Sequence, residues 1–364
     1  MTQDCDVLVI GGGPAGCTAA TLLAERGLSV VLLEKDAHPR FHIGESLLPR
    51  NMEIIERLGL TADVEAMGVL KPGAEFVSDE TGQVVKFPFA HSLNQKFTHA
   101  YQVRRAEFDS ALFANAARKG ARTAQRMRVT DIAFAGSHGA ARVTAEDAQG
   151  NLHVYAPRFV LDGSGRDTFI AGRLQTKRSN KKNTTAAVFA HFRNVERRSG
   201  ETAGYISVHL AEDGWFWMIP LQDEVMSVGF VGNQSAFRQR TGRMEDFFAE
   251  RLRTSRTVNA RMQGAERISD VHSTGNYSYR ADTAWGEGYF MIGDAFAFID
   301  PVFSSGVLLA MTAGELGADV ACAWLKDPSA GRALATASRR HPYLVTRARR
   351  QRSCLTILAR DVRT

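Results

Sequence analysis

Two tryptophans of this chain stand two residues apart, at Trp215 and Trp217, in a run that closes on Ile219 and Pro220. The whole chain has only four tryptophans, so the pair is unusual. Alternate residues of a strand point to the same face, and both indoles would therefore project from one side of a sheet. Such a pair is either ordinary core material, because buried aromatic pairs are common, or a barrier beside a reactive group.

A second chemical motif opens the chain. Residues 6–10 form an apolar run typical of a buried parallel strand, and residues 11–16 then match G-x-G-x-x-G. A helix is predicted over residues 15–26, and a second apolar strand over residues 28–33. This strand, loop, helix and strand order predicts a dinucleotide-binding unit.

Each glycine of that loop has its own physical task. Gly11 allows the tight turn, Gly13 lets backbone N–H groups approach a pyrophosphate, and Gly16 lets the helix pack closely on the strand. The helix N-terminus favours the phosphate charge. Glu34 ends the second strand, where a carboxylate accepts hydrogen bonds from a ribose.

Three further strings resemble the FAD-dependent oxidoreductases related to p-hydroxybenzoate hydroxylase. Residues 103–109 are similar to V-x-R-x-x-F-D, residues 162–165 to a D-[GA]-x-G turn, and residues 288–295 to a strand that ends in Gly-Asp. In that family the last aspartate, here Asp294, holds the ribityl hydroxyls of the flavin. Only one Gly-rich fingerprint is visible, so a separate NAD(P)H-binding fold is not predicted.

Within that group the chain resembles the flavin-dependent halogenases that act on phenols and on carrier-tethered pyrroles or aryl groups. The resemblance rests on W-x-W-x-I-P at residues 215–220, G-E-S-x-x-P at 44–49, a lysine before G-A at 71–74, and F-x-x-P-x-x-S-x-G at 298–306. It implies that reduced FAD and oxygen oxidise chloride or bromide to hypohalous acid, which then halogenates an aromatic ring. A flavin monooxygenase or a polyprenyl-type reductase of the same fold is the alternative.

The resemblance also assigns site residues. It gives Lys71 a catalytic role and makes Trp215 and Trp217 the barrier between flavin and substrate, with the halide at Ser305 and Gly306. No metal site is implied. The predicted cofactor-binding residues are Gly11, Gly13, Pro14, Ala15, Gly16, Glu34, Lys35, Arg40, Glu45, Ser46, Arg105, Asp162, Gly293, Asp294, Pro301 and Gly306.

The chain departs from the family pattern in two places. Tryptophan halogenases carry a glutamate where this chain has Phe303, which argues against free tryptophan as the substrate. The C-terminal segment, residues 326–364, is basic and shorter than the helical segment usual in the family. Arginines crowd residues 339–352, and we expect them either to solvate a terminal helix or to meet an acidic carrier protein.

The predicted fold is α/β, a Rossmann-like FAD-binding domain with an inserted strand-rich substrate domain. Residues 1–165 and 275–325 should form the first domain, a parallel sheet with helices on both faces, and residues 166–274 a mixed or antiparallel sheet. Residues 306–325 are predicted as a core helix, and a last basic helix should run over about residues 330–350.

Composition excludes other classes. No apolar run approaches the roughly 18 residues of a membrane span, and no secretory signal opens the chain, so a cytoplasmic enzyme without a transmembrane segment is expected. The four cysteines have no metal spacing. The net charge of +6 is mild, and the arginines lack the interleaved aromatics of a nucleic-acid site. The partners expected are a flavin reductase that supplies reduced FAD and an aromatic substrate, either free or tethered to an acyl or peptidyl carrier protein.

Overall fold

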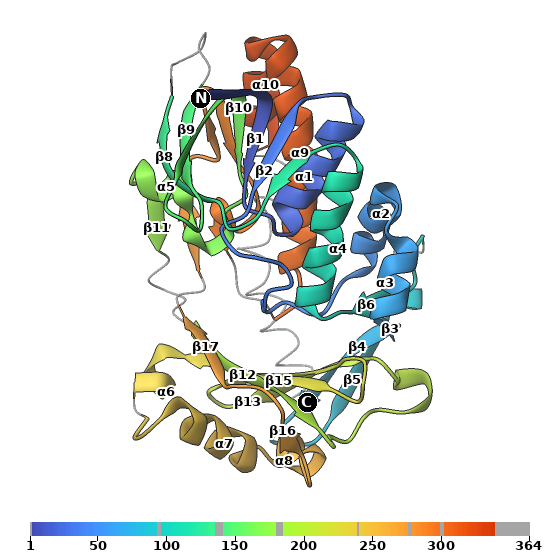
Figure 1. The fold of residues 1–364 in the computed structure, drawn as a ribbon. Coiled ribbons are helices and arrows are strands. Elements are labelled where there is room, and N and C mark those ends of the chain that lie inside the picture. Colours follow the sequence, from blue (N-terminus) through green and yellow to red (C-terminus); the bar gives the residue numbers. More distant parts are fainter. Residues whose placement is uncertain are drawn as a thin grey trace.

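The computed structural model describes residues 2–92, 96–134, 141–179, 185–238, 240–275, 278–298 and 302–338. Figure 1 shows two layers, with a parallel sheet and its long helices above and a second sheet below. Three short helices lie on the far side of the second sheet. The α/β class and the inserted strand-rich sheet predicted from the sequence are confirmed.

The upper sheet is built around the first strand, β1 (Thr2–Ile10), which runs parallel to its two neighbours. Side chains alternate along β1, so Val7 and Val9 face one cluster of buried side chains while Leu8 and Ile10 face another. The strand order is β19 (Trp285–Gly286), β20 (Tyr289–Met291), β10 (Leu152–Asp162), β1, β2 (Val30–Leu33) and β7 (Arg122–Ala124).

Long helices cover one face of this sheet, and a hairpin with a short helix covers the other, whereas the sequence predicted helices on both faces. Val9 lies on the helical face, and the helices there are α1 (Pro14–Glu25), α4 (Arg105–Arg118) and α9 (Gly306–Lys326). The other face packs on a hairpin, β8 (Arg128–Ala133) and β9 (Arg142–Glu146), and on the short helix α5 (Phe169–Arg173). β10 pairs with β1 along residues 154–162 on one side, while its other side pairs with β9 at residues 152–155 and with β20 at residues 160–162, which joins the hairpin to the sheet.

The core helix α9 lies where the sequence placed it. By length and composition alone its 21 residues could cross a membrane, which the search for apolar runs did not indicate. In the fold it packs against α1, and a Cβ at Gly314 would lie 2.5 Å from the carbonyl oxygen of Ala15. The face of α9 that packs on α1 and the parallel sheet is buried in the main hydrophobic cluster, which makes α9 a core helix of this fold. The following helix, α10 (Pro328–Ser338), begins the predicted basic helix, whose remainder lies outside the described residues.

The second sheet is largely antiparallel. Its strand order is β16 (Glu266–Arg267), β12 (Thr185–Arg193), β15 (Met226–Asn233), β14 (Gly214–Pro220), β13 (Ile206–Ala211), β4 (Gly73–Ser78) and β5 (Val84–Pro88), and β17 (His272–Gly275) also pairs with β12. One face packs on α6 (Gln234–Arg238), α7 (Met244–Thr254) and α8 (Arg256–Arg261). The opposite face of the second sheet faces the parallel sheet.

Two strands of this sheet come from inside residues 1–165, which the sequence assigned to the first domain. β4 runs parallel to β13, with Ile206 opposite Ala74, and β5 forms the edge. We therefore propose that residues 73–88 belong with the second sheet, whereas α5, predicted within the inserted domain of residues 166–274, belongs with the parallel sheet. The remaining elements join the layers: α2 (Pro49–Leu58), α3 (Thr61–Met67), the pair β3 (Val69–Lys71) and β6 (Ala100–Gln102), and the small sheet β11 (Lys177–Ser179), β18 (Tyr279–Ala281) and β21 (Ala297–Phe298).

Candidate functional site

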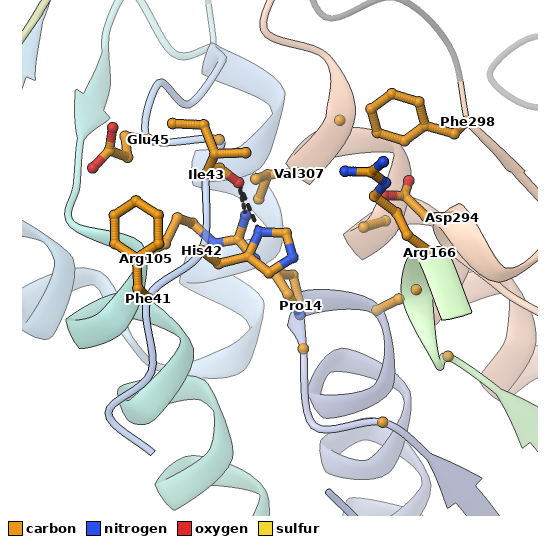
Figure 2. Close-up of a pocket in the computed structure, with 18 of the residues that line it drawn as sticks. Pro14, Phe41, His42, Ile43, Glu45, Arg105, Arg166, Asp294, Phe298 and Val307 are labelled. Carbon is orange, nitrogen blue, oxygen red and sulfur yellow. Dashed lines mark hydrogen bonds between the residues drawn. The ribbon is translucent and has the colours of Figure 1, made fainter. Parts of the chain in front are cut away.

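A cavity of about 320 Å³ lies between the layers, at the carboxyl ends of β1 and β2. Open α/β sheets bind ligands at this edge, and the volume lies within the range of small-molecule sites. The glycine loop, the segment of residues 40–46, the turn of residues 163–167 and the start of α9 all line the cavity. Figure 2 shows Arg105, His42 and Glu45 on one side, with Arg166 and Asp294 across from them.

The glycine loop presents bare backbone to this cavity. A Cβ at Gly13 would come no nearer than 3.7 Å to another residue, and one at Gly306 would meet nothing within 4 Å, so both positions face open space. Gly11 and Gly16 serve packing instead: a Cβ at Gly16 would lie 1.9 Å from the carbonyl oxygen of Gly11. Exposed N–H groups at two helix N-termini fit the phosphates of a dinucleotide such as FAD.

Glu34 holds the loop in shape. Its carboxylate accepts hydrogen bonds from the backbone N–H groups of Gly12 at 2.7 Å and Asp36 at 2.9 Å, and the guanidinium of Arg40 lies 3.5 Å away. All four of the predicted residues Pro14, Ala15, Lys35 and Arg40 line the cavity, and the ammonium of Lys35 pairs with Asp167 across it. The predicted dinucleotide-binding residues therefore meet in one wall.

A buried ion pair forms the floor beside this loop. Arg105 donates from Nε and from a terminal nitrogen to the two carboxylate oxygens of Asp109, at 2.7 and 2.9 Å. Its other terminal nitrogen donates to the carbonyl oxygen of Ile43 at 2.8 Å, as does His42 Nδ1 at the same distance (Figure 2). Burial, with the nearby charge of Arg105, lowers the pKa of His42 to about 4, so this imidazole stays neutral near pH 7.

Asp294 lines the cavity on the side across from Arg105. Burial raises the pKa of its carboxyl to about 6, against the opposing charges of Arg105 and Arg166. A carboxylate that lacks water accepts hydrogen bonds from hydroxyls strongly, which suits the ribityl chain of a flavin. Arg166 anchors its guanidinium on β17 through the carbonyl oxygen of Gly275 at 2.8 Å and the hydroxyl of Thr274.

The tryptophan pair forms the roof. Trp215 and Trp217 lie on the face of β14 that lines the cavity, 6.0 Å apart between ring centroids, while Phe216 between them packs on the opposite face. The indole of Trp217 donates to Ser227 at 3.1 Å. It lies over Gly229, where a Cβ would approach the ring to 2.2 Å.

Lys71 is fully buried, with 1% of its surface exposed. Its Nζ donates to the hydroxyl of Ser46 and the carbonyl oxygen of Leu47, each at 2.8 Å, and lies 5.2 Å from the ring of Phe89. No carboxylate pairs with it among the described residues. Burial therefore lowers the pKa of Lys71 to about 7. Ser46 and Glu45 line the cavity, so Lys71 stands directly behind its wall.

The start of α9 carries the predicted halide residues. Gly306 lines the cavity, and Ser305 is buried beside it with a hydroxyl that finds no partner among the described residues. Ser304 has a φ of 54° and also lines the cavity. Pro301, predicted to bind the cofactor, lies outside the described residues.

Among the described residues, three predicted cofactor residues do not line the cavity: Gly16, which packs α1 on β1, Asp162 and Gly293. Asp162 accepts hydrogen bonds from the backbone N–H groups of Ser164 at 2.9 Å and Ile170 at 2.8 Å, so it shapes the turn that carries Gly163 to Asp167. Gly293, with a φ of 59°, supports the turn before Asp294 and approaches Ala15. Asp162 and Gly293 thus act on the cavity through their neighbours.

Sequence reasoning missed several residues of the site. The imidazole of His191 is hydrogen-bonded to the carboxylate of Glu45, with 2.8 Å between Nε2 and Oε1, and Asp109 is the ion-pair partner of Arg105. Asp109 stood in the V-x-R-x-x-F-D string, so its spacing of four residues from Arg105 on one helix was a usable signal. His191 is a polar residue within an apolar strand, and that alone marked it for attention.

Comparisons with known proteins agree with this geometry. The family described as FAD binding domain matches residues 4–343. The chain is 35% identical to a tryptophan 2-halogenase of Chondromyces crocatus, over 87% of this chain and 61% of that protein. It is 33% identical to a pyrrole-2-carbonyl peptidyl-carrier-protein brominase of Pseudoalteromonas luteoviolacea, over 86% of this chain and 76% of that protein.

Solved structures give the same result. The myxobacterial chondrochloren halogenase CndH superimposes with a TM-score of 0.87 and 32% identity, over 94% of this chain and 79% of that chain. The chain thus spans 61% of the length of one curated relative and about three quarters of another. With the glycine loop, the tryptophan pair and the buried lysine in place, the chain belongs to the FAD-binding domain family and, within it, to the flavin-dependent halogenases.

Proposed function

We propose that this protein uses reduced FAD, oxygen and chloride or bromide to halogenate an aromatic ring. The observation that carries the proposal is Lys71, a buried amine without a counter-charge among the described residues, behind the cavity wall. A structural lysine would lie at the surface or be paired with a carboxylate. Bound FAD supplies the reaction of reduced flavin with oxygen, which oxidises the halide to hypohalous acid.

The chain's own residues divide the remaining work. The backbone N–H groups of Ser305 and Gly306 attract a halide at the positive end of α9. Trp215 and Trp217 keep the organic ring away from the flavin. The amine of Lys71 receives the hypohalous acid, as a hydrogen-bond donor or by forming an N–halogen bond with loss of water. Its lowered pKa favours the second role, because a neutral amine is a nucleophile.

We propose an aromatic substrate tethered to a carrier protein. One relative is named as a brominase of a carrier-bound pyrrole, and another as a chlorinase of the same kind from Pseudomonas fluorescens. A third is named as a tryptophan 2-halogenase, so overall similarity does not separate the ring classes. Phe303 supports the tethered substrate: it packs near Phe76, 6.2 Å between centroids, and offers no carboxylate to a free amino acid.

Two further parts of the proposal concern the source of reduced FAD and the cellular compartment. A separate flavin reductase supplies the reduced FAD, because a single Gly-rich fingerprint is present. The protein works in the cytoplasm, in keeping with the free thiols of Cys5, Cys17 and Cys322. The arginines of residues 339–352, predicted to meet an acidic carrier, lie outside the described residues, and that docking stays a prediction.

Mass spectrometry after turnover tests the function. The protein receives chemically reduced FAD, oxygen and bromide with a panel of free phenols and carrier-bound pyrroles. We expect a product that carries bromine and disappears when bromide is omitted. A hydroxylated product that forms without halide would instead assign the monooxygenase alternative, and rapid oxidation of NADPH by the protein alone would contradict the need for a reductase.

A further inference from the structure

Glu45 is the cavity-lining carboxylate nearest to Lys71 in sequence, and its burial is almost complete at 1%. One of its oxygens, Oε1, lies 2.8 Å from Nε2 of His191. The other, Oε2, is buried and has no partner among the described residues. A buried carboxylate with a single neighbour depends on that neighbour, because an unpaired buried charge is costly.

The strand that carries His191 brings it to the cavity side by simple alternation. On β12, Ala187 and Phe189 face the cluster that includes Trp217, whereas Val188 and Ala190 face the helices on the far side. His191 follows in the same alternation, beside Phe189. Both backbone polar groups of His191 are hydrogen-bonded: its N–H donates to the hydroxyl of Ser269 at 2.9 Å, and its carbonyl oxygen accepts from the N–H of Ile268. The imidazole therefore reaches Glu45 from a rigid sheet.

Glu45 and Ser46 are adjacent, and different partners hold them. His191 of the second sheet contacts Glu45, while Lys71 donates to Ser46. The backbone of Glu45 is also hydrogen-bonded, because its carbonyl oxygen accepts from the N–H of Val103 at 2.8 Å. The segment between the cavity and Lys71 is thus fixed at consecutive residues.

We propose that His191 is a positioning residue that fixes the Glu45 carboxylate in the wall of the FAD cavity. With the carboxylate ionised, Oε1 can only accept, so Nε2 of His191 carries the proton of this hydrogen bond. Oε2 is thereby left as the acceptor that the wall offers to a donor of the bound flavin or to a water. The consequence for delivery of hypohalous acid to Lys71 rests on the proposed function, whereas the consequence for FAD binding does not.

The test compares two substitutions that differ in their ability to donate a hydrogen bond. His191→Phe keeps a ring for the edge contact with Phe41, now 5.9 Å between centroids, but cannot donate. His191→Gln places an amide N–H near the position of Nε2. Fluorescence titration of the apoprotein with oxidised FAD gives the dissociation constant. We expect His191→Phe to weaken FAD binding about tenfold and His191→Gln to stay within about threefold of wild type, the range for one charge-assisted hydrogen bond.

Two controls separate positioning from general damage. His272→Phe changes the other histidine that stacks on Phe41, with 4.3 Å between the ring centroids. This substitution should leave FAD binding unchanged. Thermal unfolding of each apoprotein shows whether the fold survives; if His191→Phe does not fold, His191→Leu takes its place. In a double-mutant cycle, His191→Phe should add no further loss to Glu45→Gln, because the histidine acts through that carboxylate.

A second readout follows the reaction. The fraction of consumed oxygen that appears as halogenated product should fall in His191→Phe and recover in His191→Gln. The proposal is overturned if His191→Phe binds FAD as wild type does, if His191→Gln is as impaired as His191→Phe, or if the losses in the cycle simply add. Absence of halogenated product from the wild type would count against the proposed function alone, since the FAD titrations still decide the role of His191.

Discussion

Two buried cations flank the cavity, Arg105 and Lys71, and the protein treats them in opposite ways. Their exposures are similar, 6% and 1%. Burial alone would lower the pKa of Arg105, but Asp109 more than offsets it, and the pKa is raised. Within the part of the chain that the structure describes, Lys71 has only neutral oxygens as hydrogen-bond acceptors, and burial lowers its pKa to about 7. The carboxylate of Asp109 thus keeps Arg105 a permanent cation. Without such a partner, Lys71 becomes an amine that can react near neutral pH.

Replacing the lysine should produce the largest effect. Lys71→Met fills the same space without an amine, so halogenated product should fall at least about a thousandfold, within the range for loss of a reacting group. FAD binding and oxygen consumption should persist. The checks are mass spectrometry of the product and an oxygen electrode. Halogenation at the wild-type rate would show that Lys71 has no part in the chemistry.

Breaking the paired site should cost stability instead. Arg105→Met leaves the buried carboxylate of Asp109 with Arg40, at 3.3 Å, as its one ion-pair partner among the described residues. We expect the free energy of unfolding to fall by about 3–5 kcal/mol, as when one member of a buried ion pair is removed, and FAD affinity to fall with it. Urea denaturation measures this, with Arg105→Lys as the control that keeps the charge. A loss below about 1 kcal/mol would mean that Asp109 is satisfied without Arg105.

The pH dependence of stability should separate the two cations further. Between about pH 7 and 10.5 the unfolded state binds a proton at Lys71 that the folded state does not, so this residue makes wild-type stability rise with pH over that window. Below the folded pKa both states are protonated and the contribution is constant. The slope approaches about 1.4 kcal/mol per pH unit at most.

Lys71→Met should therefore be more stable than wild type at pH 7, and the difference should shrink as pH rises toward 10. Urea denaturation across this range checks the sign. Lys326→Met, at an exposed lysine, serves as the matched control for the removal of a lysine side chain. A Lys71→Met difference that did not vary with pH would show that Lys71 keeps its proton when folded.

The smallest effect is expected at Glu34, which lies in the charged wall. Glu34→Ala removes the acceptor for the N–H groups of Gly12 and Asp36 and the predicted partner of the ribose. FAD binding should weaken by about 1–2 kcal/mol, the value for a hydrogen bond to a charged group. Isothermal titration calorimetry measures it. An unchanged affinity would mean that Glu34 only shapes the loop.

Local motifs of the sequence predicted most of the cavity, because their physics is local. The strand, glycine loop and helix of residues 6–26 lie as expected, and Gly13, predicted to approach a phosphate, faces the cavity. The alternation of Trp215 and Trp217 correctly predicted a shared face. The burial of Lys71 could not be read from composition, since most lysines are exposed; only the resemblance pointed to it.

Long-range pairing accounts for what the sequence did not predict. β4 pairs with β13, more than a hundred residues away in the sequence. No feature of residues 73–78 indicates that this strand pairs in the second sheet. The hairpin on the second face of the parallel sheet depends on the length of β10. His191 meets Glu45 across 146 residues, so no spacing rule could connect them.

A direct titration of Lys71 tests the central contrast most simply. Carbon-13 NMR of protein labelled at the lysine side chains follows each ε-carbon with pH, and Lys71→Met identifies the resonance. The account predicts that this resonance titrates with a pKa of about 7. A value near the ordinary 10.5 would mean that Lys71 is a solvated or paired cation like any other, and the proposed amine chemistry would have no basis.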